Sequence, residues 1–214
     1  MLRAGSVCGT MRRMPDKPYS AACERNREPI LAVLRVHFAD RRHVLEIGSG
    51  TGQHAAWFAA HLPQLVWQTS DRAGHLAGIR GWLDDAALPN TPPPLVLDVA
   101  RGPWPRGEFD ALFSANTLHI MAWPEVEALF AALPAIASAD AKLAVYGPFN
   151  YEGRFTSASN RDFDRSLKAQ APHMGIREFA DVDRLAQAAG FVLVEDAAMP
   201  ANNRCLVWQR QAHA

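Results

Sequence analysis

Three acidic residues and a glycine-rich turn are the residues of this chain with the clearest potential for chemistry. In the stretch "HVLEIGSGTGQH", residues 43–54, Glu46 stands two positions before Gly48, and Gly50 and Gly52 follow at alternate positions. Glycine lets a backbone adopt positive φ and approach a ligand without a Cβ clash. Glycines that follow an apolar strand beside an acid therefore predict a small-molecule cofactor held close to the backbone.

The spacing of these glycines distinguishes between two classes of cofactor. Dinucleotide-binding turns use G-x-G-x-x-G, in which helix amides receive a pyrophosphate. Here the spacing is G-x-G-x-G, and this tighter form after an acid resembles motif I of class I S-adenosylmethionine-dependent methyltransferases. The resemblance implies that Glu46 and the loop, with Ser49 among its amides, meet the methionine end of the cofactor. A plain tight turn after a strand is the alternative interpretation of the loop alone.

Two further acids end the strands that follow. Asp71 closes "WQTSD" about 20 residues beyond the loop, where an acid typically binds the two ribose hydroxyls. Asp71 does not separate the two cofactor classes, because both contain ribose. Asp98 closes "LVLDV", beside Val99, where methyltransferases place an acid that accepts from the adenine amino group. Together with a terminal hairpin, these acids favour S-adenosyl-L-methionine as the cofactor.

The elements that must position these residues alternate along the chain. Expected strands cover residues 43–48, 65–70, 94–99, 109–114, 142–149, 191–196 and 204–210. Expected helices between them cover residues 53–62, 76–83, 124–133 and 179–190. Strand–helix alternation predicts an α/β, Rossmann-like, seven-stranded, mostly parallel sheet with helices on both faces. Asn202-Asn203 is a tight-turn signal, so the last two strands are expected to form a C-terminal antiparallel hairpin.

Length and composition indicate one domain and limit its partners. The chain has 214 residues, 22 Lys and Arg against 22 Asp and Glu, and 49% hydrophobic content, which suffices for one core. A zero formal charge argues against a nucleic-acid partner, and no apolar run has the length of a membrane span. Cys8, Cys23 and Cys205 have neither disulfide nor metal spacing, so no metal and a cytoplasmic location are expected.

Two segments lie outside the strand–helix alternation. We expect residues 1–15 to be a disordered leader and residues 16–214 a single methyltransferase domain. Within that domain, residues about 20–38 predict a cap helix, and residues about 150–176 form a polar connection long enough to be functional or mobile. We interpret this connection as a lid-like insertion. A short surface helix that contacts nothing reactive is the alternative.

Candidates for the chemistry of methyl transfer follow the fourth and fifth expected strands. Asn116 is placed to line the methionine end of the cofactor, and His119 follows within one turn. His119 is our candidate general base, with an ordinary pKa near 6.5. A histidine bonded to backbone at a helix start explains it equally well. Tyr146 at the end of the fifth strand is a second catalytic candidate, although a packed strand aromatic is the simpler interpretation.

Two polar residues of the expected N-terminal helix complete the candidate site. Arg25 could bind a carboxylate of cofactor or substrate bidentately, and Asn26 follows it. The alternatives are a solvated Arg25 and a helix cap for Asn26. We assign both to the cofactor site because "ERN" belongs to a peptide that carries a family resemblance.

Six peptides together carry that family resemblance, from about Tyr19 to Gln209. They are "YSAACERNREPIL", "LEIGSGTGQHAAWFA", "WQTSD", "NTLHIMAW", "YGPFNYEGRFTSASNRDFD" and "MPANN". In combination they resemble the methyltransferase-like 26 family, also known as domain of unknown function 938. The resemblance implies an S-adenosylmethionine-dependent methyltransferase with a small-molecule acceptor, and it names no substrate. A cofactor-binding module without catalytic activity and, less well supported, a nicotinamide-dependent oxidoreductase are the alternatives.

Overall fold

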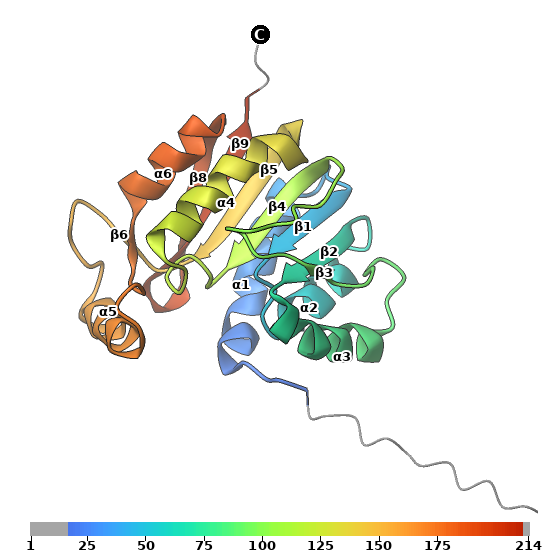
Figure 1. The fold of residues 1–214 in the computed structure, drawn as a ribbon, viewed down its shortest axis with the longest axis horizontal. Coiled ribbons are helices and arrows are strands. Elements are labelled where there is room, and N and C mark those ends of the chain that lie inside the picture. Colours follow the sequence, from blue (N-terminus) through green and yellow to red (C-terminus); the bar gives the residue numbers. More distant parts are fainter. Residues whose placement is uncertain (1–16, 212–214) are drawn as a thin grey trace, which may run out of the picture.

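Among the described residues, the main sheet has seven strands in the order β3-β2-β1-β4-β5-β9-β8 (Figure 1). The computed structural model describes residues 17–211, so the predicted leader over residues 1–15 lies outside the described residues. The strands are β1 (His43–Ile47), β2 (Val66–Asp71), β3 (Leu95–Val96), β4 (Phe109–Ala115), β5 (Ala137–Gly147), β8 (Phe191–Met199) and β9 (Asn203–Arg210). The first five are parallel neighbours, and β9 runs antiparallel to both β5 and β8. The predicted fold class, terminal hairpin included, is confirmed.

Helices cover both faces of this sheet. They are α1 (Ala21–His37), α2 (Gln53–His61), α3 (Leu76–Ala86), α4 (Trp123–Ile136), α5 (Ala158–Gln170) and α6 (Phe179–Ala188). Figure 1 shows α4 and α6 on one face and α1, α2 and α3 on the other. Within residues 17–211, no helix has both the length and the apolar character needed to cross a bilayer.

Two hydrophobic cores lie on opposite sides of the sheet because successive strand residues point to opposite faces. In β1, Val44 packs into the core under α1 and α2, whereas Leu45 packs into the core under α4 and α6. Each of these side chains is fully buried. The apolar strand runs read from the sequence are therefore covered on both sides, as in other parallel sheets.

The β1–α2 connection begins the site at the carboxyl ends of the strands. Gly52 adopts φ 89° and directly precedes α2. A Cβ on Gly52 would lie 2.9 Å from the Cα of Ile79, so α2 and α3 approach too closely for any other residue. The third glycine of the turn thus serves helix packing rather than ligand contact.

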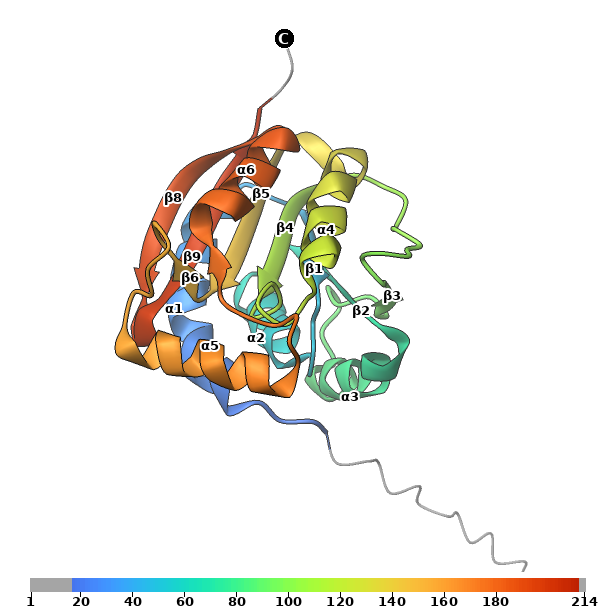
Figure 2. The ribbon, with the colours of Figure 1, turned by 60° about the vertical axis from the view of Figure 1, so that its left-hand side comes forward.

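The insertion after β5 contains a helix and a small sheet. Strand β6 (Phe149–Asn150) pairs in parallel with β7 (Arg177–Glu178), which brings the two ends of the insertion together. Helix α5 occupies half of the chain between them, with the Ser157 hydroxyl accepting from the Asn160 amide as its cap. Figure 2 shows α5 lying across the end of the molecule where β4 finishes. The insertion is thus an ordered helix held above the strand ends.

Candidate functional site

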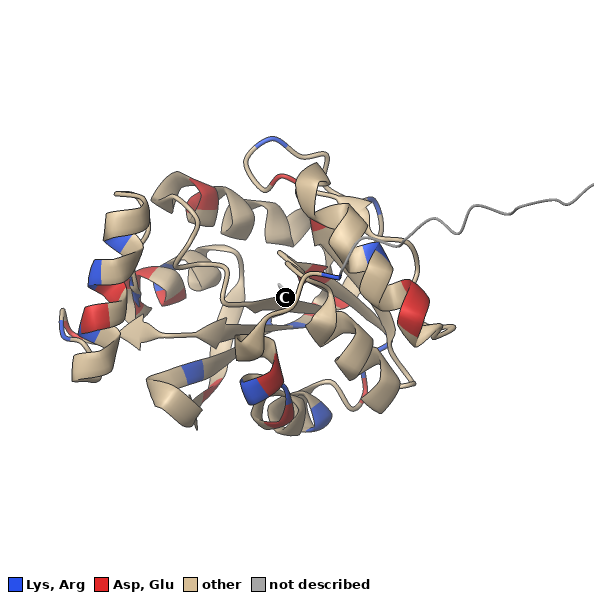
Figure 3. Cartoon of the chain, turned by 90° about the horizontal axis from the view of Figure 1, so that it is seen from below, with Lys and Arg blue, Asp and Glu red and all other residues tan. Residues whose placement is uncertain are grey.

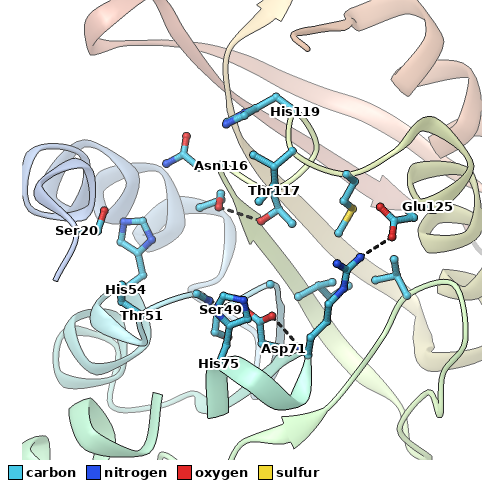
Figure 4. A pocket seen from close by; sticks show the side chains of 18 of the residues that line it. Ser20, Ser49, Thr51, His54, Asp71, His75, Asn116, Thr117, His119 and Glu125 are labelled. Atoms are coloured by element: carbon cyan, nitrogen blue, oxygen red, sulfur yellow. Dashed lines mark hydrogen bonds and ion pairs between the residues drawn. The ribbon is translucent and has the colours of Figure 1, made fainter. Parts of the chain in front are cut away.

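A cavity of about 770 Å³ opens at the carboxyl ends of the parallel strands. Seven of the predicted site residues line it, namely Gly48, Ser49, Gly50, Asp71, Val99, Asn116 and His119. The other six do not, namely Arg25, Asn26, Glu46, Gly52, Asp98 and Tyr146. Figure 4 shows His119 and Asn116 on one side of the cavity, Asp71 and His75 opposite them, and Ser20 with His54 at the α1 end.

The glycine turn forms the floor of this cavity. Gly48 and Gly50 adopt φ values of 75° and 58°, a region that other residues rarely enter. A Cβ on Gly48 would lie 2.7 Å from Thr117, so that position has no space for a side chain. A Cβ on Gly50 would meet nothing within 4 Å, which leaves open space above the turn. The turn therefore offers bare backbone to a ligand at Gly50.

Asp71 holds the glycine turn in place. The Gly50 amide donates to Asp71 Oδ2 at 2.7 Å, and the Arg72 amide donates to Asp71 Oδ1 at 2.7 Å. The Ser49 amide donates to the Ser70 carbonyl at 3.1 Å. Because two amides fix its carboxylate at the cavity wall, Asp71 is oriented before any ligand arrives. Each carboxylate oxygen of Asp71 keeps a further lone pair that can accept a hydrogen bond from a ligand hydroxyl.

Glu46 lies behind the glycine turn instead of facing the cavity. It is 1% exposed, and the Ser49 hydroxyl and the Trp67 indole N–H both donate to its Oε2 at 3.0 Å. Burial is the main reason that the pKa of Glu46 is raised to about 7. In this structure the carboxylate contacts strand β2 and the turn, whereas the family resemblance led us to expect it, with the loop amides, at the methionine end of the cofactor.

Asp98 and Val99 lie where the chain leaves β3. The Ala100 amide donates to Asp98 Oδ1 at 3.0 Å, and Arg72 Nε lies 3.9 Å from Asp98 Oδ2. Asp98 thus stabilises the turn outside the cavity, and its neighbour Val99 lines it. Arg72 also pairs with Glu125 at 2.5 Å, so this one guanidinium faces two carboxylates at this end of the cavity.

His119 is buried on the other side of the cavity, beneath α5. Its ring packs edge to face against Phe163 with 5.4 Å between ring centroids. Burial, with a contribution from the positive charge of Arg177, lowers the pKa of His119 to about 4. Among the described residues its ring has no hydrogen-bond partner, so the neutral imidazole keeps a free acceptor nitrogen. The ordinary pKa near 6.5 that we expected for His119 is therefore not the value in the folded chain.

Tyr146 turns away from the cavity because it points to the opposite face of β5 from its neighbours. It is 3% exposed, packs in the core under α1, and has a raised pKa chiefly because of burial. The backbone of Tyr146 nevertheless shapes the site, since its carbonyl accepts from the Asn116 amide at 2.8 Å. Asn116 itself adopts φ 57°, which asparagine tolerates better than most residues.

Helices α1 and α2 contribute residues that the sequence did not single out. His54 Nε2 lies 2.7 Å from Asn26 Oδ1, and His54 Nδ1 lies 3.8 Å from Cys23 Sγ. Cys23 and His54 line the cavity, whereas Asn26 is buried behind His54 and Arg25 lies outside. The one available signal for a role of His54 was its position two residues after Gly52, and we interpreted this segment only as part of an amphipathic helix. Between residues 17 and 211 no cluster of three or more His, Cys, Asp or Glu side chains could hold a metal.

Comparison with known families matches nearly the whole described chain. A family model described as a protein of unknown function, DUF938, matches residues 17–210. The chain therefore belongs to the DUF938 family.

Solved structures with the same fold include several methyltransferases. The apo form of the S-adenosylmethionine-dependent methyltransferase SibL is 22% identical with a TM-score of 0.76, covering 89% of this chain and 56% of that chain. An O-methyltransferase family protein from Burkholderia thailandensis is 19% identical with a TM-score of 0.72, covering 87% and 57%. An O-methyltransferase family 2 protein from Planctomyces limnophilus, in complex with apigenin, is 12% identical with a TM-score of 0.76, covering 88% and 57%. The chain thus spans little more than half of each neighbour, and at these identities the likeness shows the fold.

Proposed function

We propose that this member of the DUF938 family is an S-adenosylmethionine-dependent methyltransferase that acts on a small molecule. The observation that carries the proposal is the contact between the Gly50 amide and Asp71, 2.7 Å long, at the floor of the cavity. A positive-φ turn with open space above it and an oriented acid beside it suits a ligand that carries a ribose. The peptides that resemble the methyltransferase-like 26 family support the same cofactor.

The residues of the cavity fit the parts of that cofactor. Asp71 would accept from the ribose hydroxyls, and the turn around Gly50 with Asn116 would hold the methionine end. Leu97 and Val99 offer an apolar surface for the adenine. When bound, the cofactor supplies an electrophilic methyl group on a sulfonium. Only glycine leaves the backbone uncovered at position 50, because any other residue would place a side chain in the open space above the turn.

Side chains of the chain itself account for the other requirements of methyl transfer. His119, neutral and with a free ring nitrogen, would accept the acceptor's proton. Phe163 from α5 lies over His119 and lines the cavity, so it would exclude water from the reacting groups. Tyr146 remains in our proposal only through its backbone contact with Asn116.

The distribution of surface charge fits a small-molecule acceptor. In Figure 3, Lys and Arg are interspersed with Asp and Glu over the helices. On α5, Arg165 lies 3.4 Å from Asp162 and Lys168 lies 2.7 Å from Asp164. Because these charges are paired, the surface has little of the continuous basic charge on one face that a nucleic-acid partner would need. We therefore propose neither a nucleic acid nor a membrane as partner.

Calorimetry with a matched pair of variants tests the cofactor. We expect S-adenosylhomocysteine to bind the native chain and not Gly50→Arg, whose side chain would fill the open space. Gly153→Arg is the control, because Gly153 has φ 72°, also has open space around it, and lies outside the cavity. Absence of binding to the native chain contradicts the proposal, and binding of NADH in its place supports an oxidoreductase.

Incubation with cofactor carrying a labelled methyl group and with cell extract tests the reaction. A labelled small molecule supports an enzyme, and a labelled protein or RNA moves the acceptor to another class. Cofactor binding without any labelled product supports the alternative of a binding module that has no catalytic activity.

A further inference from the structure

Cys23, His54 and Asn26 form a row of side chains at the start of α1 and α2, in which His54 and Asn26 are buried and Cys23 is partly exposed. Cys23 Sγ lies 3.8 Å from His54 Nδ1, and His54 Nε2 lies 2.7 Å from Asn26 Oδ1. Cys23 and Asn26 are three residues apart on α1, so both side chains face α2 on the same side of the helix. His54 sits in the first turn of α2 and also stacks on Phe58 at 5.2 Å. Its ring is therefore held on two sides and directed at the thiol.

The order thiol, imidazole, amide is the order that activates cysteine nucleophiles in Cys-His-Asn enzymes. Because Asn26 Oδ1 is an acceptor, His54 carries its proton on Nε2, which leaves Nδ1 free to accept the proton of Cys23. Burial lowers the pKa of His54 to about 4 and raises the pKa of the Cys23 thiol. The resting pair is thus a neutral thiol beside a neutral base, and the proton moves only when sulfur attacks an electrophile.

A fixed hydrogen-bond donor belongs to Gln53, which lines a cavity together with Cys23 and His54. Gln53 is 6% exposed; its Oε1 accepts from the Ser20 amide at 2.5 Å and from the Thr51 hydroxyl at 3.2 Å. These contacts orient the amide, and its Nε2 has no hydrogen-bond partner among the described residues. An unpaired buried donor costs roughly 1–3 kcal/mol. This unused donor indicates a ligand oxygen.

Cys23 and His54 are accessible from two cavities. Both line the large cavity, and both also line a cavity of about 280 Å³ between α1, α2 and α3, together with Gln53. The charged residues of the smaller cavity are paired, Lys17 with Asp85 and Arg27 with Glu24. An uncharged ligand is therefore favoured over an ionised one at this position.

We infer that Cys23 is a nucleophilic site for uncharged alkenes conjugated to a carbonyl group. The thiol proton passes to His54 Nδ1 while Sγ forms a bond to the β-carbon. The electron pair of the double bond moves onto the carbonyl oxygen, which accepts from Gln53 Nε2. The imidazolium then returns the proton to the α-carbon, so no leaving group, oxidant or second reactant is needed. Neither the cofactor nor methyl transfer takes part, so this inference stands apart from the proposed function.

N-Ethylmaleimide, an uncharged activated alkene, is the probe that tests this inference. The full chain with Cys8→Ser leaves two cysteines, Cys23 and the fully buried Cys205, whose pKa burial raises to about 12. Labelling at pH 6, followed by peptide mapping, measures each thiol separately. At this pH a free thiol is mostly protonated, whereas His54 is still an unprotonated base. We expect Cys23 to react at least about tenfold faster than N-acetylcysteine amide, from the usual gain of general-base catalysis.

Variants of the row test whether His54 causes that reactivity. We expect His54→Ala to slow labelling of Cys23 at least about tenfold, and added imidazole to restore part of the rate. Asn26→Ala should have a smaller effect in the same direction, and Cys23→Ser should remove the label. Cys205 reports on folding, because it becomes reactive only if a variant opens the core. Two results overturn the inference: native Cys23 reacting no faster than N-acetylcysteine amide, or a folded His54→Ala labelling at the native rate.

Discussion

His119 and Phe163 pack edge to face with 5.4 Å between their ring centroids, although one follows β4 and the other belongs to α5. The contact connects the candidate base to the insertion above the strand ends. Asn160 and Asp164, on the same side of α5 as Phe163, are both buried. Asp164 Oδ1 accepts from the Ile176 amide at 2.9 Å, and the Gly175 amide donates to the His119 carbonyl at 2.9 Å. Helix α5 is therefore a fixed wall of the cavity in this state.

Phe163→Ala is expected to reduce turnover while leaving cofactor affinity unchanged. Without the ring, water reaches His119 and the acceptor loses a surface that orients it, for an expected loss of roughly tenfold or more. Phe155→Ala is the matched control, because Phe155 belongs to the same insertion, is similarly exposed and does not line the cavity. Rates of methyl transfer and calorimetric affinities give the two readouts. Equal rates in both variants contradict a role for Phe163 in covering the site.

His119→Ala is expected to retain cofactor binding and lose turnover by roughly 10²–10⁴-fold, the usual contribution of a general base. The native pH–rate profile carries the sharper test. Because the folded pKa of His119 is about 4, the ring stays a base down to that pH and loses its acceptor only as the pH falls through about 4. The acidic limb should therefore lie near pH 4 rather than near neutrality. His43→Ala, at the exposed start of β1, is the control. Full activity of His119→Ala would show that His119 has only a structural role.

Asp71→Ala is expected to weaken cofactor affinity by about 1–3 kcal/mol. The change removes the acceptor of the proposed ribose and also the partner of the Gly50 amide, so the turn loosens as well. Asp71→Asn keeps one acceptor oxygen and should lose less. Asp84→Ala, exposed on α3, is the control for a lost carboxylate outside the cavity. Unchanged affinity in Asp71→Ala contradicts the assignment of this residue.

Asn160→Ala is expected to weaken the attachment of the insertion to the β8–β9 turn. Asn160 Nδ2 donates to the Asn202 carbonyl at 3.0 Å and to the Thr156 hydroxyl at 2.9 Å, which fixes the start of α5 to the β8–β9 turn. Loss of a buried partner of this kind costs about 1–3 kcal/mol, so tryptic cleavage between Arg154 and Arg177 should accelerate roughly tenfold. Ser166→Ala, on the exposed side of α5, should cleave like the native chain.

Ligands provide the complementary measurement on the insertion. We expect cleavage between Arg154 and Arg177 to slow when cofactor and acceptor are both bound, because Phe163 then has a partner in the cavity. A protein in which a short Gly-Ser linker replaces the insertion should bind cofactor and lose turnover. If that shortened protein methylates its acceptor normally, the insertion has no role in turnover and only connects the elements on either side of it.

Most of the fold could be predicted because strand periodicity and burial are local properties of the sequence. The deviations have tertiary causes. Strand β3 was expected over residues 94–99, but pairs only at Leu95–Val96, because the chain turns where the Gly102 amide donates to the Asp98 carbonyl at 2.6 Å. Strand β5 starts at Ala137 rather than at residue 142, and polar residues near its start concealed that beginning. The pairing of β6 with β7 joins residues too far apart for any local pattern.

The site could be predicted where backbone conformation forms it and not where distant side chains do. The turn at Gly50 and the acid at Asp71 follow from strand ends, which the sequence marks. The contact between Asn26 and His54 joins residues 28 positions apart, and only the packing of α1 on α2 produces it. The burial of Glu46 depends on Trp67 of the neighbouring strand, which periodicity could place in the core but not beside that carboxylate.

Glu46→Gln is expected to stabilise the chain at neutral and higher pH. The folded pKa of Glu46 is raised to about 7 from an ordinary value of 4.5, so the folded state holds a proton that the unfolded state releases between these values. The buried Glu46 carboxyl therefore costs the native chain no stability below about pH 4.5. As the pH rises from there through 7, the native chain loses stability. Glutamine does not titrate, and its side-chain oxygen can accept both bonds that Glu46 Oε2 accepts from Ser49 and Trp67.

The difference in unfolding free energy between Glu46→Gln and the native chain should thus grow with pH. It should be small at pH 5 and reach on the order of 2–3 kcal/mol at pH 8, since one pKa unit corresponds to about 1.4 kcal/mol. Urea denaturation at each pH gives the two curves, and subtraction removes the titration of His54 and His119, which both chains share. Glu28→Gln, exposed on α1, should follow the native curve. A difference that stays constant from pH 5 to pH 8 would show that Glu46 remains ionised in the folded chain, and its place behind the glycine turn would then need a buried positive partner.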